Sequence, residues 1–339
     1  MTESSASSPE TQSGFASLGQ AEPTHFDRAQ IWLVLALLLI AISANAIGGI
    51  NYLTGLFLSE QDVLVAGIVI VGGLLVSKQR EGLAKLWNAL IGTRFLQVWI
   101  IAGLVLLVAL GGTFLVFSNY PLSLDEFWAR ADGAAFARGV PLAQIPQEWR
   151  SYGEALQPIF TRLVPDEGLW ASTYLPVNAL LQWLGGPVAS PLMAAASVVM
   201  IALIARRLFP DEPFAPALAA ILLATSAQTL LTAMTPYSMT AHLLFDLVWL
   251  WLFLQRRMWA YLASLVIAAL AMGLHQEAFF PLFALPFLLE RFLTGQRLFA
   301  VLYVICIGAG FLAWNSYDLF VYGWFDASPP VEATTGSDR

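Results

Sequence analysis

The sequence carries little charge for its length. Only 12% of its 339 residues are Asp, Glu, Lys or Arg, whereas 58% are hydrophobic. A soluble domain usually has about 25% charged residues. Charged residues at this frequency are too few to cover the surface of a water-soluble globule. Much of the surface must therefore face lipid. The net charge of −7 comes without a basic stripe, which argues against a nucleic-acid partner.

Cysteine and the common cofactor motifs are also scarce. Cys306 is the only cysteine, which excludes an internal disulfide and a CxxC metal site. It lies in an apolar run, and we interpret it as a small buried hydrophobe. GxxxxGK[ST], GxGxxG and HExxH are absent, which disfavours an ATP-driven, a dinucleotide-dependent or an HExxH zinc enzyme.

Long apolar runs dominate instead. A transmembrane helix needs about 20 apolar residues. Nine segments approach this length, although the seventh and eighth are short and either tilt or form a hairpin that crosses only partly. We therefore predict an all-α polytopic membrane protein with about nine transmembrane helices. The spans are residues 31–50, 62–77, 95–117, 187–204, 214–231, 238–254, 259–274, 278–289 and 297–319.

The polar segments between these runs define the predicted organisation. Residues 1–30 are rich in Ser, Thr, Gly, Gln and Glu and are expected to be a disordered cytoplasmic tail, followed by two transmembrane helices in 31–77. Residues 78–94 have apolar positions at helical spacing among basic ones, which predicts a cytoplasmic amphipathic interfacial helix. Residues 95–323 form the main transmembrane domain, in which 118–186 is an external loop with short interfacial helices, and 324–339 is a polar tail.

Basic residues predict the orientation. With a cytoplasmic N-terminus, Arg28, the basic residues of 78–94 and the later arginines all fall inside, as the positive-inside rule requires. Loop 118–186 and the corner 274–277 then face outward, and nine spans leave the C-terminus external. We expect an integral protein of the inner (cytoplasmic) membrane. The later arginines are Arg206, Arg207, Arg256, Arg257, Arg291 and Arg297.

Asp125 and Glu126 are the candidate catalytic residues. They follow the third predicted span closely and so stay near the membrane plane. A carboxylate there can act as a general base toward a lipid-linked substrate, or Asp125 can hold a divalent cation such as Mg or Mn. The alternative is structural, because Ser123-x-x-Glu126 is a capping box that starts a helix. The two interpretations are compatible if Ser123 and Glu126 cap while Asp125 does chemistry.

A second group of candidates lies at the predicted outer ends of later spans. His275 and Glu277 form a corner on the same face as Asp125, and ionisable groups at this depth are site candidates by default. His275 can pair with a phosphate or move a proton, or the corner is only a polar turn. Tyr237 can bond a substrate hydroxyl, or it anchors the helix at the interface.

Other polar residues have simpler interpretations. His242 and Asp246 are four residues apart on one helix face and are expected to pair with each other. Arg138, Arg150 and Arg162 lie in the external loop. Arginine suits bidentate phosphate binding, and Arg150 is the candidate among them, although a solvated loop charge explains each equally simply.

An ordered series of motifs resembles the GT-C superfamily of membrane glycosyltransferases, which includes protein O-mannosyltransferases and aminoarabinose transferases. The resemblance runs from residue 95 to 326, and Thr235 stands where the family has Arg before Pro-Tyr. The matching stretches are Leu124-Asp125-Glu126-Phe127, Tyr174-Leu175-Pro176 with Leu180-Leu181, residues 201–209, Pro236-Tyr237-Ser238, and Gly273-Leu274-His275 with Ala278-Phe279-Phe280.

The resemblance implies a GT-C-like fold and a sugar donor linked to polyprenyl phosphate. Asp125 would deprotonate a hydroxyl of a glycan, lipid or protein acceptor on the external (periplasmic) face. Among the candidate substrate and phosphate contacts, Tyr174, Tyr237 and His275 lie in the matching stretches, whereas Arg150 and Glu277 are candidates by residue type and position. Two alternatives stay open. One is a transporter or flippase of a lipid-linked or small solute, against which the external position of most ionisable residues argues. The other is a truncated, non-catalytic relative.

Overall fold

The computed structural model describes residues 95–139, 143–157, 160–164 and 168–317, together with Gly82 and Lys85, both of which are helical. The predictions for the two tails and the first two spans therefore lie outside the described residues, as does the rest of the amphipathic helix 78–94. The chain divides into two compact units, Met1–Gly92 and Thr93–Arg339. All contacts below belong to the second unit.

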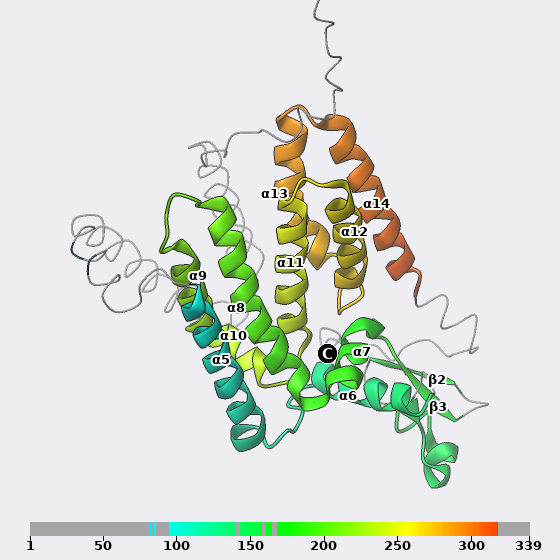
Figure 1. Ribbon diagram of the computed structural model, residues 1–339. Helices are drawn as coiled ribbons and strands as arrows, with labels where there is room; N and C mark the ends of the chain where they lie inside the picture. The colour runs from blue at the N-terminus through cyan, green and yellow to red at the C-terminus, as the bar shows by residue number, and fades with distance from the viewer. Residues whose placement is uncertain are drawn as a thin grey trace, which may run out of the picture. The chain divides into compact units, whose positions relative to one another are not determined.

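Helices make up most of the second unit (Figure 1). They account for each predicted span from residue 95 onward, which confirms the mostly helical class. The α-helices are α5 (Leu96–Gly111), α6 (Leu124–Ala137), α7 (Pro176–Gly185), α8 (Ala189–Leu208), α9 (Ala215–Ala224), α10 (Ala227–Ala233), α11 (Ser238–Leu254), α12 (Met258–Met272), α13 (Phe279–Leu293) and α14 (Arg297–Asn315). The shorter turns are the π-helix η3 (Gly112–Val116) and the 3-10 helices η4 (Gln147–Tyr152) and η5 (Gly186–Val188).

Membrane-crossing length is reached by only some of these helices. By length and composition, three helical stretches of the described chain can cross a bilayer: Leu96–Val116, Val177–Leu208 and Arg297–Asn315. The pair α9 and α10 adds a fourth if it forms one broken span. Helices α11 and α12 are apolar but shorter, at 17 and 15 residues. An integral membrane protein is compatible with these helices, and the total of nine spans stays a prediction.

The fifth predicted span is broken in the middle. Helices α9 and α10 meet at Thr225 and Ser226 and are bent by 63°. Ser226 has extended backbone angles, and its hydroxyl accepts a hydrogen bond from the backbone N–H of Thr229 at 3.4 Å. This is an N-cap, which starts a new helix instead of continuing the old one. The apolar run alone did not indicate this break.

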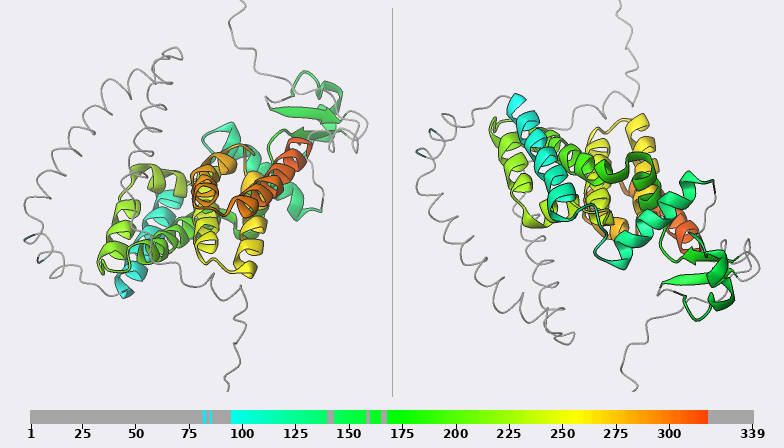
Figure 2. Two further views of the ribbon diagram at one scale, coloured as in Figure 1. Left: turned by 90° about the horizontal axis from the view of Figure 1, so that it is seen from above. Right: turned by 90° about the horizontal axis from the view of Figure 1, so that it is seen from below.

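Helix α8 lies between two groups of helices. On one side its residues Ala194 and Val198 pack with Val98 and Val105 of α5. On the other side Met193 belongs to a larger core with α11, α12, α13 and α14. Seen from above and below, α5 and α9 lie on one side of α8 and α12 and α14 on the other (Figure 2). Small residues on α8 allow the close approach on both sides.

A small sheet within the external loop was not predicted. The strands β1 (Ala143–Gln144), β2 (Thr161–Val164) and β3 (Leu169–Ser172) form an antiparallel sheet in the order β1-β3-β2. Gly168 precedes β3 with φ +63°, a conformation that favours glycine. The expectation that this loop contains only short helices was incomplete. Strands of two to four residues carry too little alternation to be recognised in a sequence.

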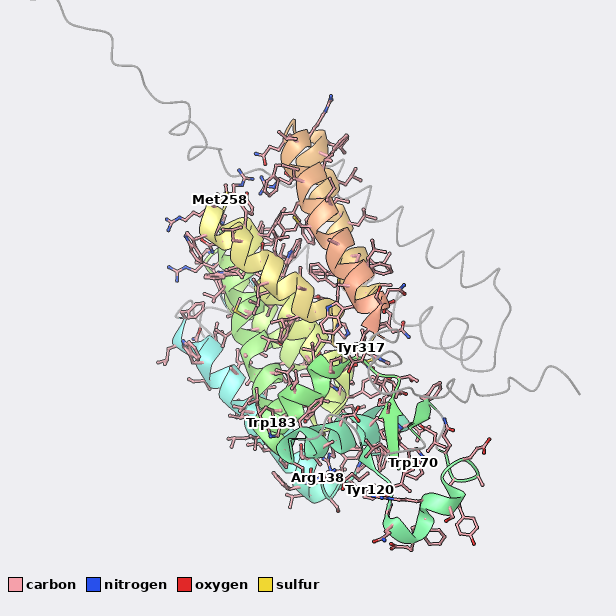
Figure 3. All side chains as sticks on the ribbon, turned by 90° about the vertical axis from the view of Figure 1, so that its right-hand side faces the viewer. Tyr120, Arg138, Trp170, Trp183, Met258 and Tyr317 are labelled. Carbon is pink, nitrogen blue, oxygen red and sulfur yellow. The ribbon has the colours of Figure 1, made fainter. Side chains whose placement is uncertain are left out.

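Arginines gather at the end of the bundle that lies away from α6 and α7. Arg206 and Arg207 end α8, and the Arg207 Nε–H donates to the carbonyl of Leu254 at the end of α11, at 2.9 Å. Met258, which begins α12, lies at the opposite end of the molecule from Tyr120, Arg138 and Trp170 (Figure 3). The arginines of the helix ends therefore lie away from the end that carries Asp125, while the arginines of the external loop, such as Arg138, lie at the other end. Which compartment each end meets stays a prediction.

Cys306 is exposed on α14, so the prediction that it is buried in protein was wrong. Its neighbours Ile305 and Val304 are exposed as well, and α14 is among the helices long and apolar enough to cross a bilayer. An apolar run therefore does not distinguish a residue that packs against protein from one on an exposed apolar helix face, which can meet lipid.

Candidate active site

The start of α6 places Asp125. The Ser123 hydroxyl accepts a hydrogen bond from the backbone N–H of Glu126 at 3.4 Å, and the Glu126 carboxylate accepts one from the backbone N–H of Ser123 at 3.0 Å. The predicted capping box is therefore confirmed. Glu126 also accepts from the backbone N–H of Leu122. Glu126 is buried where it caps the helix. It is not among the residues that line the pocket beside Asp125.

Helix α7 connects the parts of the chain that meet at this pocket. Pro176 occupies its first position, where a missing N–H costs nothing. The next free backbone N–H, of Val177, donates to the carbonyl of Gly273 at 3.0 Å. The Asn178 amide donates to the carbonyl of Pro236, also at 3.0 Å. These two bonds hold the histidine corner and the beginning of α11 against α7, next to Tyr174.

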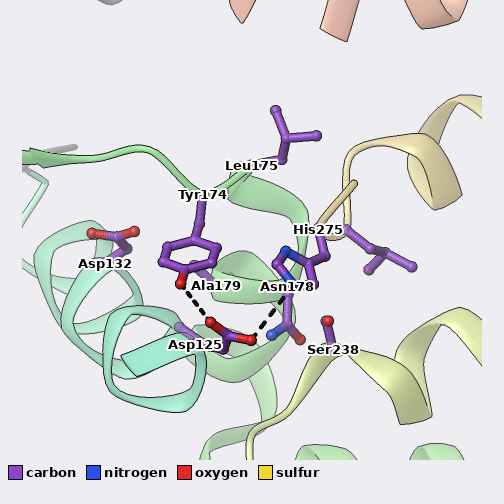
Figure 4. A pocket seen from close by; sticks show the side chains of 10 residues that line it. Asp125, Asp132, Tyr174, Leu175, Asn178, Ala179, Ser238 and His275 are labelled. Carbon is purple, nitrogen blue, oxygen red and sulfur yellow. Dashed lines mark hydrogen bonds and ion pairs between the residues drawn. The ribbon is translucent and has the colours of Figure 1, made fainter. Parts of the chain in front are cut away.

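Three predicted site residues converge on one another (Figure 4). The Tyr174 hydroxyl donates to one carboxylate oxygen of Asp125. The His275 Nε2 lies 3.6 Å from the other oxygen. The rings of Tyr174 and His275 are 5.4 Å apart. The side chains of His275 and Asp125 remain 17% and 27% exposed, so a substrate can reach them.

Tyr237 is the fourth predicted residue at this place. Burial, a hydrogen bond to Asp125 and the Asp125 charge raise the pKa of its phenol to about 12. Burial and the same carboxylate raise the pKa of Tyr174 well above its usual range. Both phenols therefore keep their protons at neutral pH. They act as neutral hydrogen-bond donors that orient the Asp125 carboxylate.

Asp132 is a pocket residue that the sequence analysis missed. It lies on α6, seven residues after Asp125, lines the same pocket and is buried. Burial raises the pKa of its carboxyl to about 7, and a hydrogen bond with Ser172 opposes this rise. The seven-residue spacing puts two carboxyl groups on one helix face, and this was the signal that could have identified it.

Asp132 makes a pH-dependent contribution to stability. Because the folded state binds its proton more tightly than the unfolded state, unfolding releases that proton between about pH 4 and pH 7. This contribution falls as the pH rises through that window and is lost above about pH 7. We expect Asp132→Asn to raise the melting temperature more at about pH 8 than at about pH 5. Thermal unfolding at both pH values, with Asp211→Asn as the control, measures this difference. A gain that is the same at both would contradict it.

The pocket is small. It has a volume of about 10 Å³ and is lined by polar groups of Asp125, Asp132, Tyr174, Asn178, Ser238 and His275. This volume holds about one water molecule. A single hydroxyl group therefore fits beside the Asp125 carboxylate, while a larger substrate would remain outside the pocket. A positioned carboxylate in contact with one hydroxyl can accept its proton.

The remaining candidates lie elsewhere. Arg150 is exposed on η4, where its Nε–H donates to the carbonyl of Ile145 at 3.3 Å and its stem covers Gly168. Arg138 is exposed at the end of α6, and Arg162 lies in β2. Glu277 follows His275 on the same corner. Neither Arg150 nor Glu277 is among the residues that line the pocket, so the structure does not bring them to Asp125.

His242 and Asp246 do not pair with each other, so that prediction was wrong. Both ring nitrogens of His242 and one carboxylate oxygen of Asp246 are buried without a hydrogen-bond partner among the residues that the structure describes. The His242 ring instead packs against Phe279, with ring centres 5.5 Å apart. Ser238 lies one turn before His242 on α11, and its hydroxyl is also buried without a partner. The three residues form a polar line on one face of α11.

Gly273 is required where α7 meets the histidine corner. A Cβ at this position would overlap the Trp314 ring and lie 2.6 Å from a methyl group of Val177. We expect Gly273→Ala to lower the free energy of unfolding by about 1–3 kcal/mol, the usual cost of overpacking. Gly308→Ala is the control, because no atom lies within 4 Å of a Cβ there. Equal melting temperatures for the two variants in thermal unfolding would contradict this prediction.

The residues around Asp125 offer few metal ligands. Within the described stretches, no three His, Cys, Asp or Glu side chains lie close enough together to share a metal ion. Both carboxylate oxygens of Asp125 already contact Tyr174 or His275, and among the other pocket residues Asp132 and Asn178 offer oxygen atoms. Hard divalent cations prefer several carboxylate or carbonyl oxygens. The arrangement does not fit a Mg or Mn site.

The fold and the site were also compared with known proteins. No protein-family model matches the chain, and no curated protein or solved structure is significantly similar to it.

Proposed function

We propose that the protein is a membrane glycosyltransferase of the GT-C type, which moves a sugar from a polyprenyl-phosphate donor to an acceptor hydroxyl. One observation carries the proposal. Asp125, Tyr174 and His275 are 49 and 101 residues apart along the chain, yet their side chains meet at one partly exposed pocket. Convergence of ionisable and polar groups on a cleft is typical of a catalytic site.

The proposed reaction needs one base and one route for the departing phosphate. Asp125 accepts the proton of the acceptor hydroxyl while that oxygen bonds to the anomeric carbon of the sugar. The bond between this carbon and the lipid phosphate breaks, and its electron pair leaves on the phosphate. His275, when protonated, offers a positive charge to the departing phosphate. Tyr174 and Tyr237 keep Asp125 oriented toward the hydroxyl.

Transfer of a labelled sugar tests the proposal. The full chain in membranes is supplied with a radiolabelled polyprenyl-phosphate sugar, and label in glycan, lipid and protein fractions is measured. We expect label to become linked to an acceptor only when the protein is present. Label that stays on the donor in the presence of each acceptor class would contradict the proposal.

Transport of a small or lipid-linked solute is the second candidate function. It is favoured by the buried polar line Ser238, His242 and Asp246 on α11, because unpaired polar groups inside a membrane helix bundle often mark a transport path. The same radiolabelled donor distinguishes the two functions. Movement of intact donor across sealed vesicles, without a linked product, would favour transport.

A further inference from the structure

A second pocket lies on the other side of the contact between α6 and α7. Its volume is about 320 Å³, much larger than the space beside Asp125. Among the described residues that line it, Arg130 is the charged one, and most of the others are small or apolar. Trp183 forms part of the wall, and Asn119 and Gln182 add polar groups. The pocket is therefore apolar with one positive charge.

The guanidinium of Arg130 is held by a neutral partner. Two of its nitrogens donate to the backbone carbonyl and the side-chain oxygen of Asn119. In the described part of the chain no carboxylate lies within ion-pair distance of Arg130. The negative charge of Glu126 interacts electrostatically with Arg130. The Glu126 carboxylate, however, already accepts hydrogen bonds from two backbone N–H groups in the α6 cap. A half-buried arginine without an ion pair favours an anionic ligand.

The backbone of the loop before α6 is arranged for this contact. Ser118 and Asn119 both have positive φ angles, 50° and 53°. This conformation is uncommon for residues other than glycine, although asparagine adopts it more readily than most. It turns the chain sharply after η3 and points the Asn119 carbonyl at Arg130.

The two pockets are separate. A Cβ at Gly133 would lie 3.0 Å from the carbonyl oxygen of Ala179, so α6 and α7 touch through their backbones between the pockets. Asp125 and Asp132 line the small pocket, whereas Arg130 lines the large one. A ligand at Arg130 therefore does not enter the space beside Asp125.

Exposed leucines stand close in the chain to two residues that line the large pocket. Leu184, next to Trp183 in the chain, is 74% exposed, and Leu115, shortly before Asn119, is 85% exposed. Side chains of this kind contact acyl chains at a membrane surface, and tryptophan prefers the headgroup level. We propose that the Arg130 pocket binds the phosphate headgroup of an anionic membrane lipid, whose chains lie along these exposed leucines. This site does not depend on the proposed transfer reaction.

Lipid binding to the purified full chain tests this site. Arg130→Gln keeps hydrogen-bond donors for Asn119 but removes the charge, and Ala137→Phe fills the pocket while keeping Arg130. Arg138→Gln is the matched control, because Arg138 is exposed at the end of the same helix and is not part of the lining. Binding of phosphatidylglycerol, phosphatidylcholine and inorganic phosphate is measured by native mass spectrometry and thermal stabilisation in detergent.

We expect the wild type and Arg138→Gln to bind phosphatidylglycerol about tenfold more tightly than phosphatidylcholine, and both pocket variants to lose this preference. The same preference in Arg130→Gln and in the wild type would overturn the proposal. Stabilisation by inorganic phosphate as strong as that by phosphatidylglycerol would also overturn it, since the site would then bind a soluble anion.

Discussion

Asp125→Asn is expected to lower the rate of sugar transfer by about 10²–10⁴-fold, the usual contribution of a general base. Asparagine keeps an oxygen that can accept the Tyr174 hydrogen bond, so the pocket should retain its shape. The amide cannot accept a proton from the acceptor hydroxyl. Donor binding should therefore change little while the catalytic rate falls. Initial rates at several donor concentrations separate these two effects.

The control for this experiment is Asp211→Asn. Asp211 is exposed in the turn between α8 and α9, and its removal changes the net charge by the same amount. It should transfer sugar at the wild-type rate. If Asp125→Asn also transferred at that rate, Asp125 would have no catalytic role, and the proposed site would lose its base.

Much of the candidate site could be predicted because each residue stands beside a readable boundary. Asp125 follows Ser123 in a capping box, and Tyr237 and His275 occur where apolar runs end. The alternation of basic and non-basic ends then assigned these boundaries to one membrane face. A common face limits where residues can meet, and the contacts of Asp125 with Tyr174 and His275 agree with it.

The parts that could not be predicted depend on tertiary contacts. The spacing of Asp132 from Asp125 indicates a shared helix face, but Asp132 becomes part of the pocket only because α7 packs against α6, and the sequence around it does not indicate that packing. Arg150 looks like a phosphate ligand by residue type, yet the sheet around Gly168 uses its stem as cover. His242 and Asp246 have the spacing of a pair, but their side chains do not bond. Spacing establishes a shared helix face and does not establish the direction of each side chain.

Trp249→Ala is expected to cost about 3–5 kcal/mol of stability, the range measured for large aromatic side chains in protein cores. Trp249 on α11 is 0% exposed. Its ring stacks on Phe253 at 4.8 Å and meets Phe280 of α13 edge-on at 5.3 Å. Its indole N–H donates to the Tyr303 hydroxyl of α14 at 2.9 Å. One side chain thus joins three helices, and its loss leaves a cavity that they cannot close together.

Two further variants separate packing from hydrogen bonding. Trp249→Phe keeps an aromatic ring, and the Tyr303 hydroxyl keeps its partner Ser264 at 2.6 Å. Its cost should therefore be smaller, since a hydrogen bond inside a membrane protein is worth about 0.6 kcal/mol. Trp259→Ala removes a tryptophan that is 54% exposed and should have little effect on thermal unfolding in detergent. Because α13 begins four residues after His275, the Trp249→Ala cavity should also loosen the histidine corner and slow sugar transfer. An equal loss of stability in the Trp249→Ala and Trp259→Ala variants would mean that this aromatic cluster does not hold the bundle together.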